Sequence, residues 1–165
     1  MQRIAASGPV RGGATAVNLS LESIIDPPFV DWLFAKLKAQ PAVARNIIIE
    51  VMEQSLIGHI DAVKAAFSRL RETGARLSID RFGQSTASVG YLRSLEIDYI
   101  KIDGSYTRGM ADSSDRQFFV QALVGIAHGL GIQVLTEYTE TEKDFELAKS
   151  LMVDGVQGYF IGKPE

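Results

Sequence analysis

The segment YIKIDGSY, residues 99–106, joins a short run of β-branched and aromatic residues to charged residues at the point where that run ends. Its apolar residues predict a buried strand over residues 99–102. Because side chains alternate along a strand, Lys101 and Asp103 are expected on the same face. An internal ion pair, a phosphate contact or a water molecule beside a metal ion would each use such a pair.

Five other short apolar runs have the same form, and each ends at a polar residue. The further strand candidates are residues 15–19, 47–51, 77–80, 133–136 and 155–157. Their polar residues are Asn18, Glu50, Asp80, Glu137 and Gln157. The carboxyl ends of parallel strands converge on one face of an α/β fold, so we expect these side chains to form one site.

Each residue also has an ordinary structural interpretation. Asn18 at a strand end could be a turn or cap residue. Glu50 could be one half of a simple ion pair, since an unpaired buried charge is costly. Asp80 is followed closely by Gly83, which is a common turn arrangement as well as a common metal-ligand arrangement.

Amphipathic segments separate the strand candidates, at residues 28–40, 59–73, 117–129 and 141–151. Alternating strands and helices predict parallel strands joined by right-handed crossovers. About six strands are visible, whereas a closed (β/α)8 barrel needs eight. The chain is therefore predicted to be α/β, either an incomplete barrel or a smaller open sheet. Trp32, Phe118 and Phe119 are assigned to packing, and His59 and His128 to helix positions outside the site.

Composition excludes several classes of function. At 165 residues with 46% hydrophobic content, the chain is long enough for one domain with a proper core. A net charge of -3 argues against a broad surface for duplex nucleic acid. The absence of cysteine excludes disulfides and thiolate metal sites and is compatible with the cytoplasm. No apolar run is long enough to span a bilayer, so this segment is not expected to contact a membrane.

Six segments, in order, resemble motifs of the EAL domain family, which binds and hydrolyses the bacterial second messenger cyclic di-GMP. AVNLS resembles the family's VNLS, IIIEVMEQS its LEITES-like segment, and SIDRFGQSTAS its DDFGTGYSS loop. YIKIDGSY resembles KIDRSF, TEYTET resembles AEGVET, and DGVQGYFIGKP resembles the DxxQGYxFxxP ending. The resemblance covers essentially the whole chain, and six motifs in order are far more specific than one.

The resemblance implies a TIM-like barrel that uses two Mg²⁺ or Mn²⁺ ions to activate water against a phosphodiester. Asn18, Glu50 and Asp80 resemble metal ligands. Lys101 resembles the residue that holds the catalytic water, and Glu137 resembles a further catalytic residue.

Other positions are assigned to ligand binding or to support of the site. Asp103 and Gln157 resemble residues around the ligand, and Arg81 is predicted to face the same ligand. Glu53 resembles a glutamate that braces the loop after the third strand, and Glu140 resembles a supporting acidic residue.

Departures from the family point away from hydrolysis. Active members have two consecutive aspartates where this chain has Asp80 and Arg81, so the second metal loses a ligand and meets a cation. Unit charges about 4 Å apart interact by roughly 4 kcal/mol at an effective dielectric of 20, and a divalent ion doubles this. Tyr138 replaces the usual glycine after the glutamate. The EAL motif itself would precede Asn18 by more residues than are present.

These observations predict that residues 1–165 are the carboxyl-terminal portion of a single EAL-like domain, an incomplete TIM-like barrel. The sequence segments resemble most closely those of LapD-like receptors, which bind cyclic di-GMP without hydrolysing it. We expect a catalytically degenerate regulatory module, with one remnant Mg²⁺ or Mn²⁺ site that binding does not require. The expected location is cytoplasmic, including the cytoplasmic part of a membrane-anchored receptor. An active phosphodiesterase is one alternative. A ligand-free module that dimerises or contacts other signalling domains is another.

Overall fold

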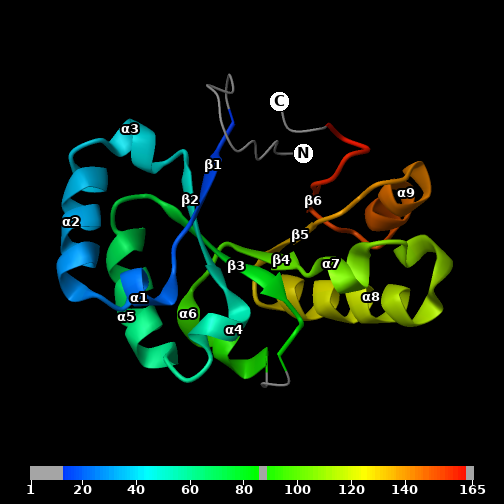
Figure 1. Ribbon diagram of the computed structural model, residues 1–165, viewed down its shortest axis with the longest axis horizontal. Helices are drawn as coiled ribbons and strands as arrows, with labels where there is room; N and C mark the ends of the chain where they lie inside the picture. Colours follow the sequence, from blue (N-terminus) through cyan, green and yellow to red (C-terminus); the bar gives the residue numbers. More distant parts are fainter. Residues whose placement is uncertain (1–12, 86–88, 163–165) are drawn as a thin grey trace.

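Six parallel strands form one curled sheet in the computed structural model, which describes residues 13–85 and 89–162 (Figure 1). The strands are β1 (Thr15–Asn18), β2 (Ile47–Met52), β3 (Arg76–Phe82), β4 (Tyr99–Ile102), β5 (Gln133–Thr136) and β6 (Gly155–Val156). They lie side by side in sequence order, and within the described residues β1 and β6 are the two open edges. This arrangement is a half-barrel, which confirms the prediction of an incomplete TIM-like barrel.

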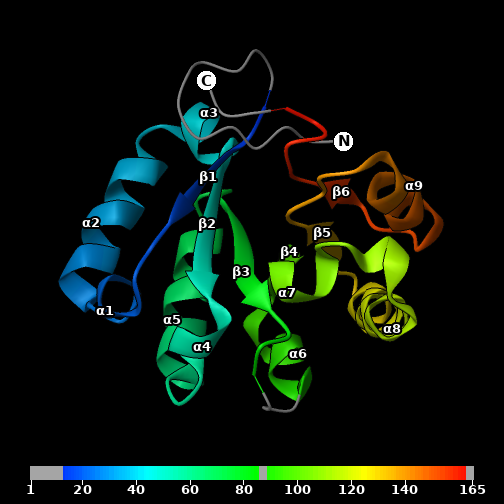
Figure 2. The same ribbon diagram turned by 45° about the vertical axis from the view of Figure 1, so that its right-hand side comes forward.

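Helices follow one another around the outside of the curled sheet (Figure 2). The longer helices are α2 (Pro27–Lys38), α5 (Ile60–Arg71), α8 (Ser114–Gly129) and α9 (Glu142–Ser150). Shorter segments are α1 (Leu21–Ile24), α3 (Pro41–Ala44), α4 (Glu53–Leu56), η1 (Val89–Tyr91), α6 (Leu92–Leu95), α7 (Gly104–Thr107) and η2 (Met110–Asp112). None of the described helices is long and apolar enough to cross a membrane.

Capping side chains explain where α2 and α8 begin. The side chain of Asp26 accepts a hydrogen bond from the Phe29 amide, and proline follows it in the first turn of α2. Ser113 caps α8 in the same way through the Arg116 amide. The predicted helices are therefore present. Helix α8 begins three residues earlier than its apolar periodicity indicated, because its first turn is polar and is set by the capping serine.

The core lies between the sheet and the outer helices. Strands β2, β3 and β4 supply fully buried residues such as Ile49, Ile79 and Ile100, and α5 supplies Phe67. All six strand predictions are confirmed, although β3 is longer than predicted and extends to Phe82.

Register is regular except between β3 and β4. Ile79 pairs with Ile100 and Phe82 pairs with Ile102, so β3 contains one extra residue between these pairs. The extra residue produces a bulge at Asp80 and Arg81, and Arg81 has a positive φ of 52°. Bulges re-aim side chains at the ends of strands, and this one sits where the site was predicted.

The packing assignment for two aromatic residues was wrong. Trp32 is 54% exposed and Phe118 is 75% exposed, because both lie on outward-facing sides of outer helices. Phe119 does pack, with its ring 3.9 Å from the ring of Tyr106. The histidines lie outside the site, where His59 occupies the position before the first residue of α5 and the His128 Nε2 lies 2.8 Å from Asp154.

Candidate functional site

Lys101 lies at the centre of the site, and carboxylates from three neighbouring segments surround its ammonium group. Its Nζ is 3.2 Å from Glu50 Oε2 on β2, 3.5 Å from Asp80 Oδ1 on β3 and 3.0 Å from Glu137 Oε1 just after β5. Glu50, Asp80 and Lys101 are each buried. Consecutive parallel strands thus bring together four side chains that are distant in sequence.

Electrostatics within this cluster keep the lysine charged. Burial alone would lower the pKa of Lys101, but the negative charges of Glu50, Glu137 and Asp80 outweigh it and raise the pKa above its ordinary value. Burial also raises the pKa of Glu50, and the charges of Asp80 and Glu137 add to this rise against the opposing effect of Lys101. The cluster holds three acids against one base and is short of positive charge.

Two carboxylate oxygens of the cluster can accept a further cation. Among the described residues, Glu50 Oε1 is buried without a hydrogen-bond partner, and the buried Asp80 Oδ1 has the 3.5 Å ion pair with Lys101 Nζ but no hydrogen bond. Asn18 is adjacent, because it pairs with Glu50 in the register of β1 and β2. Carboxylate and amide oxygens are ligands that Mg²⁺ and Mn²⁺ accept, so these residues fit one divalent ion.

A complete metal cage is not present in the described part of the chain. Within residues 13–85 and 89–162, no group of three or more histidine, aspartate or glutamate side chains is placed to hold a metal ion. A bound ion would need the Asn18 amide or a displacement of Lys101. Asn18 is itself exposed, so water is available to complete its coordination.

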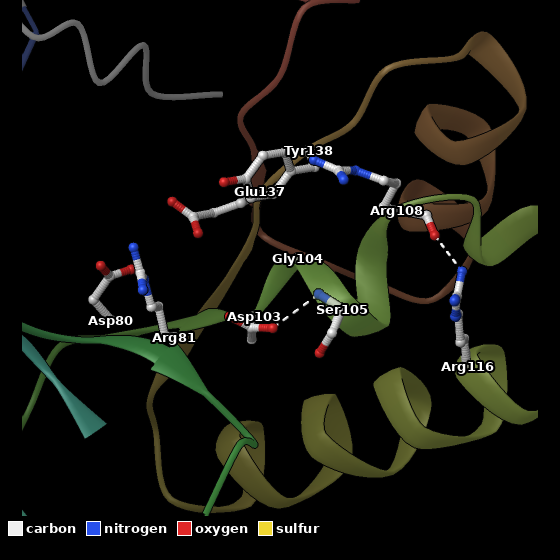
Figure 3. Close-up of a pocket in the computed structure, with 9 residues that line it drawn as sticks. All are labelled: Asp80, Arg81, Asp103, Gly104, Ser105, Arg108, Arg116, Glu137 and Tyr138. Atoms are coloured by element: carbon white, nitrogen blue, oxygen red, sulfur yellow. Dashed lines mark hydrogen bonds between the residues drawn. The ribbon is translucent and has the colours of Figure 1, made fainter. Parts of the chain in front are cut away.

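Arg81 introduces a fixed positive charge directly beside this cluster. The bulge turns its backbone into the left-handed region, and its side chain is exposed at the rim of the pocket. Figure 3 shows Arg81 next to Asp80, on the side of the pocket that faces Glu137 (Figure 3). A second divalent ion at this place would meet a guanidinium group in place of a carboxylate.

An open pocket of about 560 Å³ lies at the carboxyl ends of β3, β4 and β5. Its lining residues are Asp80, Arg81, Asp103, Gly104, Ser105, Arg108, Arg116, Glu137 and Tyr138. Both charge signs are represented, which suits a ligand with anionic phosphates and with hydrogen-bonding bases.

Asp103 lies on the floor of the pocket as the N-cap of α7. It accepts a hydrogen bond of 2.8 Å from the Ser105 amide. Burial alone would raise the pKa of Asp103, but hydrogen bonds from Ser105 and Gln84 and the charge of Arg81 lower it below its ordinary value. The carboxylate is therefore ionised at neutral pH and fixes the start of α7.

Glu53 lies outside the pocket and holds the loop that follows β3. Its Oε2 accepts hydrogen bonds from the Gly83 amide at 3.0 Å and the Ser85 amide at 3.1 Å. Its Oε1 accepts a hydrogen bond of 2.7 Å from the Tyr91 hydroxyl. Burial, this hydrogen bond and the charge of Glu53 raise the pKa of Tyr91 well above its ordinary value.

The structure does not bring every predicted residue into the pocket. The exposed Gln157 and Glu140 do not line it. The Gln157 backbone instead ties β6 to the end of β5, through its amide to Thr136 and its carbonyl to Thr139.

Sequence reasoning missed Ser105, Arg108, Arg116 and the position of the Tyr138 ring. Only Tyr138 carried a sequence signal, as the residue in place of the family's glycine. The others follow a predicted strand end by two or more residues, where the alternation of a strand no longer indicates direction.

Comparison with known proteins gives a family match. The model of the EAL domain family matches residues 1–164. The cyclic di-GMP phosphodiesterase PA2567 of Pseudomonas aeruginosa is 34% identical, over 90% of this chain and 25% of its own length. The cyclic di-GMP phosphodiesterase PdeF of Escherichia coli is 33% identical, over 91% of this chain and 20% of its own length. The chain thus spans a quarter or less of these curated relatives.

Solved structures match the half-barrel closely. The PaMucR phosphodiesterase in complex with cyclic di-GMP superposes with a TM-score of 0.84 at 30% identity, covering 92% of this chain and 62% of that one. The manganese and cyclic di-GMP complex of Klebsiella pneumoniae BlrP1 gives a TM-score of 0.81 at 29% identity, covering 92% and 39%. Vibrio cholerae LapD bound to cyclic di-GMP gives 0.81 at 22% identity, covering 92% and 37%, and this likeness shows the fold alone.

Proposed function

The chain belongs to the EAL domain family, and from this premise we propose that it is the ligand-binding portion of a cyclic di-GMP receptor that does not hydrolyse its ligand. Residues 1–165 are then the carboxyl-terminal portion of one EAL-like domain, which acts in the cytoplasm within a larger signalling protein. Relatives and structural neighbours named for cyclic di-GMP support the choice of ligand.

The observation that carries this proposal is Arg81 beside an otherwise retained cluster. Two-metal hydrolysis of a phosphodiester needs both ions to stabilise the attacking and leaving oxygens. Arg81 lies at the rim of the pocket next to Asp80, where it repels a second ion and attracts a phosphate. Its guanidinium supplies positive charge to the ligand without supplying an activated water.

One cation can still contribute to binding. Asn18, Glu50 and Asp80 would hold it through oxygens that include Glu50 Oε1 and Asp80 Oδ1, which accept no hydrogen bond from the described residues. An ion held there supplies charge to a phosphate oxygen. Arg81 supplies positive charge from the protein itself at the pocket, so binding of the dinucleotide does not require the ion.

A second candidate function is metal-dependent hydrolysis of cyclic di-GMP. It is favoured by the retained contacts of Lys101 with Glu50, Asp80 and Glu137. A third candidate is a module for dimerisation or domain contact. It is favoured by the unpaired edges of β1 and β6 within the described residues, since the free N–H and C=O groups of an edge strand can pair with another chain.

Calorimetry and product analysis on the full-length protein separate these candidates. We expect cyclic di-GMP to bind in EDTA and to remain intact after incubation with Mn²⁺ or Mg²⁺. Arg81→Asp should bind an additional Mn²⁺ ion and should gain or greatly raise hydrolysis. Arg93→Asp, which makes the same charge change on α6, is the control and should do neither.

Two results would overturn the receptor proposal. Rapid turnover by the unmodified protein would establish the phosphodiesterase candidate. Absence of binding at high micromolar cyclic di-GMP, together with a stable dimer in sedimentation, would establish the interaction module.

A further inference from the structure

The ring of Tyr138 lies directly against Gly104, on the wall of the pocket that carries α7 (Figure 3). A Cβ atom at position 104 would lie 2.2 Å from Tyr138 Cδ2 and 2.5 Å from Cε2. Gly104 has no positive φ, so its backbone suits any residue and the missing side chain is what the ring requires. The position of the ring therefore depends on glycine at residue 104.

Arg108 lies over the same ring from the end of α7. Its Cζ is 4.5 Å from the centre of the Tyr138 ring, which is cation–π distance. Its carbonyl oxygen accepts a hydrogen bond of 2.5 Å from the Arg116 guanidinium. The backbone of Arg108 is thus held by Arg116, and its side chain contacts the ring of Tyr138.

The guanidinium of Arg108 makes the cation–π contact but no ion pair within the described part of the molecule. Among residues 13–85 and 89–162, no carboxylate lies within ion-pair distance of its guanidinium. The N–H groups of a guanidinium lie in one plane and point away from its central carbon. Those groups remain free for a planar pair of acceptors in the pocket.

We propose that Arg108, positioned by Tyr138, is a specificity-determining residue that donates to O6 and N7 of a guanine base. This inference rests on the proposed function. Arginine pairs with guanine at this edge through two hydrogen bonds, whereas adenine presents an amino donor in place of O6 and repels one of them. The contact distinguishes the two purines.

The arrangement of charges favours a base contact over a phosphate contact. Arg81 lies beside Asp80 at the end of β3, and its guanidinium provides the cation for a phosphate. Arg108 lies on the other side of the pocket, above α7. A dinucleotide phosphate near Arg81 leaves its base to extend across the pocket toward Arg108.

Selectivity measurements on the full-length protein test this contact. Binding of cyclic di-GMP and cyclic di-AMP is measured for the unmodified protein, Arg108→Ala, Arg108→Lys and the control Arg93→Ala. We expect the preference for cyclic di-GMP to fall about 10- to 100-fold in Arg108→Ala and to be lost only in part in Arg108→Lys. Arg93→Ala should keep the original preference.

The alternatives give different patterns. Equal weakening of both dinucleotides in Arg108→Ala would assign Arg108 to phosphate and overturn the inference while the receptor function stands. An unchanged preference would overturn it in the same way. Failure of the unmodified protein to bind either dinucleotide would overturn the receptor function, and the inference with it.

A double-mutant cycle at Gly104 and Tyr138 tests how Arg108 is positioned. Gly104→Ala leaves Arg108 and the ring in the sequence but displaces the ring, so it should reduce the preference for cyclic di-GMP as Tyr138→Gly does. In the double variant the two losses of preference should not add, because both substitutions act by removing the ring from the same position. Tyr138→Phe keeps the ring and should retain the preference. Circular dichroism establishes that each variant is folded, and additive losses would contradict the coupling.

Discussion

The ammonium of Lys101 lies 3.2 Å from Glu50 Oε2, and the two side chains are only 6% and 2% exposed. Asp80 and Glu137 complete the surroundings of the same ammonium. Taking these charges out of water is costly, and their mutual attraction offsets that cost only while the base is present. Lys101 therefore holds together the carboxyl ends of the central strands.

We predict that Lys101→Met lowers the free energy of unfolding by about 3–5 kcal/mol at pH 7, because three carboxylates then face one another without a base. Urea denaturation in EDTA measures this. The second substitution Glu50→Gln, added to Lys101→Met, should restore part of the loss by removing one charge. Lys64→Met on the exposed side of α5 is the control, and an equal effect there would contradict the prediction.

The Glu53 carboxylate is predicted to set the local stability of the loop after β3. Glu53→Gln leaves one acceptor oxygen where two amides and a hydroxyl now donate. Hydrogen bonds to a charged group contribute about 1.5–3 kcal/mol, so the exchange rates of the Gly83 and Ser85 amides should rise at least about 10-fold. Hydrogen exchange measured by NMR tests this, with Glu142→Gln at the start of α9 as the control.

Tyr91 is predicted to make stability depend on alkaline pH. Its folded-state pKa is raised by burial, by its hydrogen bond to Glu53 and by the charge of Glu53. The stabilisation is complete below the unfolded pKa of about 10 and is lost as pH rises above it, since only the unfolded state then releases the proton. The free energy of unfolding should fall above pH 10, and less so in Tyr91→Phe.

Ultraviolet titration at the phenolate band checks the same point. In the unmodified protein, the absorbance change of Tyr91 should appear only with unfolding, and Tyr91→Phe should remove that late component. Ionisation of Tyr91 in the folded state near pH 10 would contradict the prediction.

The fold could be predicted from the sequence because its signals are local and repeat. Each strand is a short apolar run, such as residues 47–52, and each long helix has its own apolar periodicity. Parallel topology then brings Glu50, Asp80 and Lys101 together without further information. Sequence order equals sheet order, so the simplest arrangement was also the one observed.

The finer geometry of the site could not be predicted, because it depends on contacts between segments distant in sequence. The bulge that turns Arg81 comes from the register of β3 against β4, which no local pattern encodes. The position of Tyr138 depends on the space left at Gly104, 34 residues earlier in the sequence. Exposure of Trp32 was missed for a related reason, since apolar periodicity does not show whether a helix has a neighbour on that face.

The last prediction concerns Gly158, which lies where the chain after β6 packs against Thr139. A Cβ atom there would lie 2.2 Å from the Thr139 carbonyl oxygen, and the Thr139 amide donates to Gln157 in the same turn. Gly158→Ala must therefore separate β6 from the segment after β5, and we expect a loss of about 1–3 kcal/mol in the free energy of unfolding.

Gly125 in α8 is the matched control for Gly158. It has nothing within 4 Å of an added Cβ and no positive φ, so Gly125→Ala should stabilise the protein by about 0.5–1 kcal/mol through the helix backbone alone. The two alanine substitutions should thus have opposite signs in urea denaturation. The same sign at both positions would show that close approach of the Thr139 backbone does not determine the requirement for glycine at residue 158.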